Sequence, residues 1–294
     1  MLVRDLLKEK KPSISFEVFP PKRDLDIEGI FETIDQLKDL EPDFISVTYG
    51  AGGTSKDLTV DIASRVKKEM GIETIAHLTC ATSSVEEVNA TLDGLDQAGV
   101  HNVLALRGDI PPERRGEVNK PFTYASDLIS HVKDRGTYSV GGACYPEGHL
   151  ESSDLEADIR NLKKKADLGL DFLITQLFYD NETLFRFKDR LESHGIQTPL
   201  IAGILPVLNK KQIIRIQQLS GCTLPKKFLR ILNRYEHDPA ALKEAGTAYA
   251  TEQIIDLLSW GVDGVHIYTM NKAETTRRIV ESIGSIRKNL VRTL

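Results

Sequence analysis

Cysteine is scarce in this sequence. Its 294 residues include three cysteines, Cys80, Cys144 and Cys222, which lie far apart and form no Cys-x-x-Cys pair. That spacing excludes the familiar zinc and iron–sulfur ligand sets within the chain, so we expect no bound metal, and it suits a reducing cytoplasm, where we expect the protein to work. Long apolar runs are absent too: none reaches membrane-spanning length, and the first residues carry no stretch of signal-peptide length. We therefore expect neither membrane attachment nor export.

A strong charge of either sign is also missing. The formal net charge is −5 and the isoelectric point is near 5.9, a balance that argues against nucleic acid as a partner. The sequence shows no linker and no low-complexity tract, so we expect one domain over residues 1–294. This length suits a single α/β barrel, which typically takes about 250 residues.

The sequence alternates between two patterns. Between its apolar runs, apolar residues recur at three- and four-residue steps, as in Val85-Val88-Leu92-Leu95, and several of these segments end in glycine, which indicates helices. Strands that alternate with helices predict a closed (β/α)8 barrel, the TIM-barrel fold of the α/β class. Eight apolar, β-branched runs are typical of strands covered on both faces: Ser13–Phe19, Phe44–Gly50, Glu73–Thr79, Asn102–Gly108, Ser139–Pro146, Phe172–Phe178, Pro199–Val207 and Gly264–Met270.

One segment is longer than a simple barrel needs. Between the seventh and eighth strands there is room for extra helices at Lys226–Tyr235 and Pro239–Trp260, which would either cap the barrel or form a subunit contact. A doubly wound open sheet is the alternative architecture. Gly50-Ala51-Gly52-Gly53 resembles part of a glycine-rich dinucleotide turn, but it lacks the spacing and the later acidic residue of that turn. We interpret it as a loop at the mouth of a barrel.

A carboxylate lies inside the first apolar run. Glu17 has apolar neighbours on both sides, and Pro20-Pro21 prevents the strand from continuing. An ionised carboxylate removed from water must be paired or must stay protonated, and a carboxyl group with a raised pKa is a suitable general acid near neutral pH. From these residues alone, a catalytic acid and a glutamate that faces solvent or pairs with Lys22 are equally open.

Polar residues follow most of the other strands at their carboxyl ends, where (β/α)8 enzymes place their active sites. Taken singly, each has a structural explanation: His77 as a core histidine, Arg107 and Asp109 as an ion pair beside a turn, and Gln176 as a loop cap. Their convergence on one rim favours an active site instead. The residues concerned are Thr48, His77, Arg107, Asp109, Tyr145, His149, Gln176, Tyr268 and Lys272.

A polar stripe on the helix after the fifth strand adds to this rim. Asp158, Asn161 and Lys165 follow one another at helical spacing, and with Lys164 they supply groups that could hold a ribose and a pyrophosphate. The alternative is a solvated helix face. The loops after strands seven and eight lack the glycine-rich phosphate cup that many barrels carry there. A phosphorylated cofactor would therefore bind on the side of strands three to five.

With these residues laid out, the chain resembles methylenetetrahydrofolate reductase of the short bacterial type, a flavin-containing (β/α)8 barrel, over nearly its whole length. One matching string would be weak evidence, whereas eight in barrel order, each at or near a strand end, are specific. The strings are Ser15-Phe16-Glu17-Val18-Phe19-Pro20-Pro21, Val47-Thr48-Tyr49-Gly50-Ala51, Ala76-His77-Leu78-Thr79-Cys80, Leu106-Arg107-Gly108-Asp109, Tyr145-Pro146-Glu147-Gly148-His149, Thr175-Gln176-Leu177-Phe178-Tyr179-Asp180, Gly203-Ile204-Leu205-Pro206-Val207 and His266-Ile267-Tyr268-Thr269-Met270-Asn271.

The resemblance implies hydride transfer from reduced FAD to 5,10-methylenetetrahydrofolate in one-carbon metabolism, with NADH or NADPH reducing the flavin in a separate half-reaction. It makes Glu17 the general acid, which protonates the departing nitrogen, and Asp109 a carboxylate that stabilises the iminium charge. It implies folate contacts through Glu17, Gln176, Gln212, Tyr268 and Lys272. It implies FAD contacts through Thr48, His77, Arg107, Gly108, Asp109, Ala143, Tyr145, His149, Asp158, Asn161, Lys164 and Lys165.

Two positions depart from the family pattern. Ile216 stands where the family has an aromatic residue that stacks on the nicotinamide nucleotide and the folate, and Lys272 stands where it has an arginine, so a bidentate pair with the folate tail is lost. Ile216 leaves two electron sources open, NAD(P)H itself or an iron–sulfur partner subunit, and we expect a homo-oligomer or such a hetero-complex. The rival functions are a flavin-free, pterin-binding lyase or methyltransferase and a catalytically silent subunit.

Overall fold

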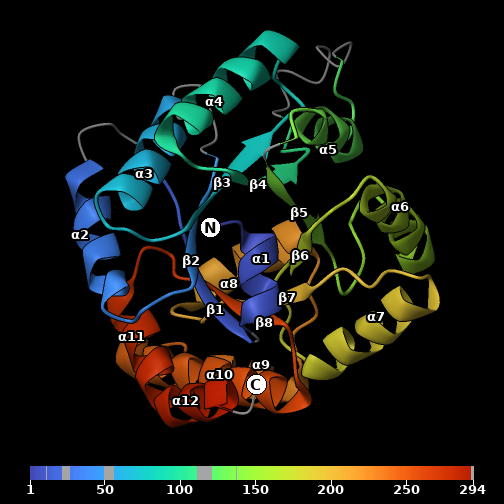
Figure 1. Ribbon diagram of the computed structural model, residues 1–294. Helices are drawn as coiled ribbons and strands as arrows, with labels where there is room; N and C mark the ends of the chain where they lie inside the picture. Colours follow the sequence, from blue (N-terminus) through green and yellow to red (C-terminus); the bar gives the residue numbers. More distant parts are fainter. Residues whose placement is uncertain (11, 22–26, 50–55, 111–120, 137, 293–294) are drawn as a thin grey trace.

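The computed structural model describes residues 1–10, 12–21, 27–49, 56–110, 121–136 and 138–292. Eight parallel strands pair in chain order, and β1 pairs with β8, which closes the barrel (Figure 1). The predicted (β/α)8 fold is confirmed and the open sheet is excluded. The strands are β1 (Ser13–Val18), β2 (Phe44–Val47), β3 (Thr74–Thr79), β4 (Asn102–Leu106), β5 (Ser139–Cys144), β6 (Phe172–Thr175), β7 (Leu200–Ile204) and β8 (Gly264–Tyr268).

Most strands are shorter at their carboxyl end than the apolar runs that predicted them. Gln176, which was expected inside the sixth strand, follows β6 instead. Its side-chain oxygen accepts a hydrogen bond from Leu177 N at 2.9 Å, and this occupies an N–H group that a longer strand would need for its ladder. Gly50-Ala51-Gly52-Gly53, expected as a mouth loop, and Lys22, the alternative partner of Glu17, lie outside the described residues.

The helices follow the strands as the periodicity predicted, and the two expected before the last strand are present with the expected bounds. Gly99 and Gly261 end their helices with φ of 71° and 94°, a left-handed conformation that glycine adopts without steric cost. The helices are α1 (Val3–Glu9), α2 (Ile27–Lys38), α3 (Lys56–Lys68), α4 (Val85–Ala98), α5 (Ala125–Asp134), α6 (Leu155–Asp167), α7 (Asn181–Ser193), α8 (Lys210–Ser220), α9 (Lys226–Tyr235), α10 (Pro239–Trp260), α11 (Ala273–Ser282) and α12 (Gly284–Arg292).

The first helix was not predicted, and it covers the amino-terminal end of the barrel (Figure 1). Leu6 and Leu7 of α1 are buried against side chains from the beginnings of the strands, among them Phe44, Leu104 and Phe172. This apolar layer closes that end of the barrel interior.

Side chains alternate along each strand, as the pleat of a strand requires. On β1, Ile14, Phe16 and Val18 belong to the large apolar core that includes the surrounding helices, whereas Ser15 contacts His266 of the neighbouring β8 and Glu17 contacts His77 of β3. The apolar runs of the sequence therefore contain an outer apolar face and an inner polar one.

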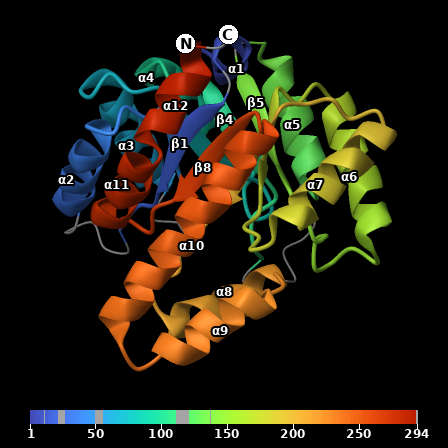
Figure 2. The ribbon, with the colours of Figure 1, turned by 90° about the horizontal axis from the view of Figure 1, so that it is seen from below.

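A helical arm extends from the end of the barrel opposite α1. In Figure 2, α8, α9 and the first half of α10 project beyond the strands. We call residues 210–235 the α8–α9 arm. An apolar cluster that includes Leu205, Val207, Ile213, Phe228 and Leu232 packs it against the barrel. None of the described helices is long and apolar enough to cross a membrane.

Candidate active site at the barrel mouth

Glu17 lies among polar side chains from three strands. The strand register places it beside Ser46 of β2 and Tyr268 of β8. Its Oε2 is 3.6 Å from His77 Nε2 and 4.0 Å from His266 Nε2. The side chain is 19% exposed, while those of His77 and His266 are 8% and 0% exposed. Glu17 is thus the member of this group that substrate can reach from the mouth.

Burial determines where the protons of this group lie. It raises the pKa of Glu17 from 4.5 to about 8 and lowers the pKa of His77 to about 4. Burial also lowers the pKa of His266 to about 3, and the neighbouring His77 adds to this shift. All three directions favour the uncharged form because a charge is poorly solvated here. Near neutral pH, Glu17 holds a proton and the two imidazoles hold no charge, so the contacts are not ion pairs.

The hydrogen bonds around His266 fix its tautomer. Ser15 Oγ donates to Val265 O at 3.2 Å, so it accepts from His266 Nδ1 at 2.8 Å, and Ser46 Oγ then donates to His266 Nε2 at 3.0 Å. His77 Nε2 is buried 3.6 Å from Glu17 Oε2 and has no other polar partner among the described residues. The protonated carboxyl of Glu17 is therefore backed by rigid, neutral groups.

A cavity of about 630 Å³ opens at the same end of the barrel, between the ends of β4 and β5, the start of α5 and one side of α6. Its size is within the usual range of small-molecule sites, about 300–1,000 Å³. Eight residues expected at a flavin line it: Arg107, Ala143, Tyr145, His149, Asp158, Asn161, Lys164 and Lys165. The expected location of a phosphorylated cofactor, on the side of strands three to five, agrees with this cavity.

The polar groups of the cavity are held in place by one another. Lys165 donates to Ala143 O at 2.9 Å, and burial lowers the pKa of its ammonium group. Asp158 accepts from His149 N at 3.2 Å and from Ser152 Oγ at 3.1 Å, which orders the loop between β5 and α6. These donors and cations suit a ribose and a pyrophosphate.

The four other residues expected at the flavin do not line this cavity. Thr48 follows β2, where its backbone N donates to Val18 O at 3.0 Å, and His77 faces Glu17. Gly108 and Asp109 directly follow Arg107, and the Asp109 side chain is exposed at the rim. Burial raises the pKa of Tyr145 to about 12, and Asp109 is close enough to add to that shift.

The residues expected at the folate lie on two sides of the mouth. Tyr268 Oη donates to Thr175 O at 2.6 Å, directly above Gly203, where a Cβ atom would lie 2.5 Å from that hydroxyl. Gln212 is in the first turn of α8, and Ile216 follows one turn later, packed against the arm's apolar cluster. Lys272 is exposed and lines a different hollow, beside Asn271 and Lys243. No described contact joins Gln212 or Lys272 to Glu17.

Several site residues escaped the sequence analysis because it followed strand ends and not helix starts. Tyr124, Ala125 and Ser126 at the start of α5, and Glu151, Ser152 and Ser153 before α6, also line the cavity. Helix N-termini are suited to anions, so the first turn of each helix after a polar strand end was the signal that could have found them. Glu151 also pairs with Arg107 at 2.6 Å.

The β1 end is held by residues that follow β8. Thr269 Oγ1 donates to Glu17 O at 2.6 Å, and the Asn271 side chain accepts from Phe19 N at 3.1 Å and donates to Phe19 O at 2.9 Å. Asn271 has a φ of 53°, and asparagine is among the residues that tolerate this left-handed region best. These bonds fix the backbone that carries Glu17.

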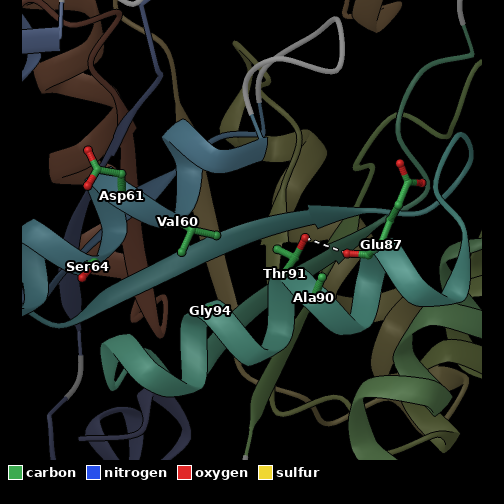
Figure 3. Close-up of a pocket in the computed structure, with 7 residues that line it drawn as sticks. All are labelled: Val60, Asp61, Ser64, Glu87, Ala90, Thr91 and Gly94. Carbon is green, nitrogen blue, oxygen red and sulfur yellow. Dashed lines mark hydrogen bonds between the residues drawn. The ribbon is translucent and has the colours of Figure 1, made fainter.

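A second hollow, of about 510 Å³, lies between α3 and α4 on the outside of the barrel (Figure 3). Its carboxylates, Asp61 and Glu87, point away from each other, and Thr91 Oγ1 donates to the Glu87 backbone O at 2.9 Å. The hollow gathers no convergent polar groups, so we assign the site to the barrel mouth.

Known proteins resemble this chain in both sequence and fold. The family model of methylenetetrahydrofolate reductase matches residues 2–284. The 5,10-methylenetetrahydrofolate reductase of Pectobacterium carotovorum is 36% identical, over 92% of this chain and 90% of that protein. Methylenetetrahydrofolate reductase (NADH) 1 of Arabidopsis thaliana is 34% identical, over 97% of this chain and 50% of that protein.

Among solved structures, an uncharacterized protein from Clostridium thermocellum that binds two copies of 5-methyl-5,6,7,8-tetrahydrofolic acid has a TM-score of 0.69 at 14% identity. The match covers 97% of this chain and all of that one, and it shows a shared fold. The family match over nearly the whole chain is independent of that likeness. The chain belongs to the methylenetetrahydrofolate reductase family.

Proposed function

We propose that this protein reduces 5,10-methylenetetrahydrofolate to 5-methyltetrahydrofolate with FAD as its cofactor. The observation that carries the proposal is Glu17, a largely buried carboxyl group whose pKa is raised to about 8 at the mouth of the barrel, the end that also holds a cavity lined by cations and hydrogen-bond donors. Opening the methylene bridge needs a proton on the departing nitrogen, which an acid of this kind can supply, and its presence argues against a protein that only binds a partner.

The cavity fits FAD by the chemistry of its lining. Lys164 and Lys165 supply positive charge for a pyrophosphate, and Asp158 and Asn161 supply groups for ribose hydroxyls. His77 Nε2 is a buried polar atom without a hydrogen-bond partner among the described residues, as expected of a group that contacts a ligand. Bound FAD would supply the hydride chemistry, which no side chain can perform.

Glu17 and Asp109 have different tasks in this proposal. Glu17 donates its proton to the folate nitrogen that leaves the methylene bridge, and the opened bridge carries an iminium cation. The exposed carboxylate of Asp109, on the opposite part of the rim, stabilises that positive charge. Two carboxyl groups with different surroundings thus serve as acid and as charge partner.

The folate would lie between Glu17 and the α8–α9 arm. Gln176 follows β6 and Tyr268 ends β8, so both border the mouth, and Gln212 is in the first turn of α8, which projects from that end of the barrel (Figure 2). Lys272 is exposed and has no ion-pair partner among the described side chains, which leaves its ammonium group available to the glutamate tail of a folate.

For the electron donor we propose NADH or NADPH, in a half-reaction separate from folate reduction. The Arabidopsis relative, whose name specifies NADH, supports this assignment. Ile216 favours a second candidate, an iron–sulfur partner subunit, because an aliphatic side chain packed on an apolar cluster offers no aromatic face for a nicotinamide. Anaerobic mixing with NADH and then NADPH separates the two: bleaching of the flavin supports the first, and no bleaching alongside activity with an artificial donor supports the second.

Purification tests the cofactor first. Yellow protein with the visible absorbance of oxidised flavin, or apoprotein that takes up added FAD, supports the proposal. Colourless protein that binds no FAD would overturn it in favour of a flavin-free, pterin-binding enzyme. Oxidation of 5-methyltetrahydrofolate with an artificial electron acceptor then distinguishes an active enzyme from a silent subunit.

A further inference from the structure

The loop between β5 and α6, residues 145–154, contacts two different parts of the molecule. On one side, Tyr145 and His149 line the cavity proposed for FAD, and Glu151 pairs with Arg107. On the other side, Glu147 and Leu150 reach the α8–α9 arm. The loop is therefore a bridge between the cavity and the arm.

The contact with the arm is made at the turn between α8 and α9. Thr223 N donates to both carboxylate oxygens of Glu147, at 3.1 Å and 3.0 Å. Leu150 lies over Gly221 so closely that a Cβ atom on that glycine would be 2.5 Å from Leu150 Cδ2.

The connection between α8 and α9 is also hydrogen-bonded to the end of α8. Cys222 N donates to Ser220 Oγ at 3.3 Å, and Ser220 Oγ donates to Ile216 O at 2.9 Å. The chain of bonds that begins at Glu147 thus ends at Ile216, one helical turn from Gln212. Because the two residues are one turn apart, they lie on the same side of α8.

We propose that Glu147 is a positioning residue, which sets the distance between the α8 face that carries Gln212 and Ile216 and the cavity for the cofactor. This inference rests on the proposed function, since it assigns those two residues to the substrate. The apolar cluster around Phe228 and Leu232 keeps the arm folded without Glu147. Loss of the bond therefore loosens the placement of α8 and does not unfold it.

Three variants test this role in the full chain. Glu147→Ala removes the acceptor, Glu147→Gln keeps one side-chain oxygen that can accept from Thr223 N, and Thr223→Ala leaves that backbone N–H in place. We expect Glu147→Ala to raise KM for the folate about five- to tenfold with kcat changed less than twofold and FAD affinity unchanged. Glu147→Gln and Thr223→Ala should stay within about twofold of the unaltered protein.

Hydrogen exchange gives a readout that needs no activity. In Glu147→Ala, amides of residues 216–224 should exchange faster, whereas those of α5 and α6 should not. Unchanged exchange and unchanged KM in this variant would overturn the inference. Equal defects in Glu147→Ala and Glu147→Gln would also overturn it, because the charge of Glu147 and not its hydrogen bond would then be what matters. If the unaltered protein neither binds FAD nor turns over folate, the proposed function fails. The exchange experiment still tests whether the contact between Glu147 and Thr223 holds the arm in place.

Discussion

Glu17→Gln exchanges a carboxyl group for an amide of nearly the same size, so it separates the protonation of this side chain from its packing. In the native protein the carboxyl group keeps its proton up to a pH of about 8, whereas its ordinary value is 4.5. A raised pKa means that the native state binds the proton more tightly than the unfolded chain does. The contribution of Glu17 to stability is therefore fully present below pH 4.5 and is lost progressively as the pH rises toward 8.

The size of this loss follows from the two pKa values. At pH 7 the unfolded chain gains about 3 kcal/mol by releasing the proton that the native state retains, and at pH 5 it gains about 1 kcal/mol. Glutamine has no proton to release. The free energy of unfolding of the variant, relative to that of the unaltered protein, should therefore rise by about 2 kcal/mol from pH 5 to pH 7.

Urea unfolding of both flavin-free proteins at pH 5 and pH 7 measures this difference, and the pH dependence of every other group cancels in the comparison. Glu86→Gln is a matched control, since hydrogen bonds at the start of α4 lower the pKa of that carboxyl group, so it is largely ionised in both states above pH 5 and the variant should show almost no change in relative stability between pH 5 and pH 7. The variant should also lose folate reduction while it keeps flavin binding and flavin reduction. A stability difference that is the same at both pH values would show that Glu17 is ionised in the native protein, and the acid assignment would be refuted.

Three further changes test other parts of the site. Lys165→Met should weaken FAD binding about 10- to 100-fold, because a buried cation is lost from the cavity; Lys163→Met, whose ammonium pairs with Asp167 along α6, is the control for titration of the apoprotein with FAD. Asp109→Asn should slow folate reduction about 100-fold and leave reduction of the flavin intact. Equal stopped-flow rates of folate reduction in the variant and the unaltered protein would contradict the role of Asp109. Gly203→Ala should lower the free energy of unfolding by about 1–3 kcal/mol, since a Cβ atom would collide with the Tyr268 hydroxyl; an unchanged urea midpoint would show that the Tyr268–Thr175 bond is not fixed.

The regular elements could be predicted because their signals are local. Residues 226–235 carry apolar side chains at helical spacing, and Pro239 and Gly261 mark the start and the end of the next helix; the structure gives both helices the expected bounds. Pro20-Pro21 similarly shows where the first strand must stop. The short first helix was missed, although Val3, Leu6 and Leu7 carry helical spacing, because seven residues give few repeats of the pattern.

The sequence by itself determined the eight strands, their polar ends and the suspicion that Glu17 is an acid. Only the tertiary structure decided that Glu17 is largely buried and keeps its proton near neutral pH, because the solvation of a carboxyl group depends on neighbours far away in the chain. His266 follows Glu17 by about 250 residues and approaches it only because β8 pairs with β1. The same holds for Glu147 and Thr223, 76 residues apart. Periodicity shows which side chains face inward, but barrel closure determines which of them meet. The neighbours that meet Glu17 in this way determine whether it keeps its proton.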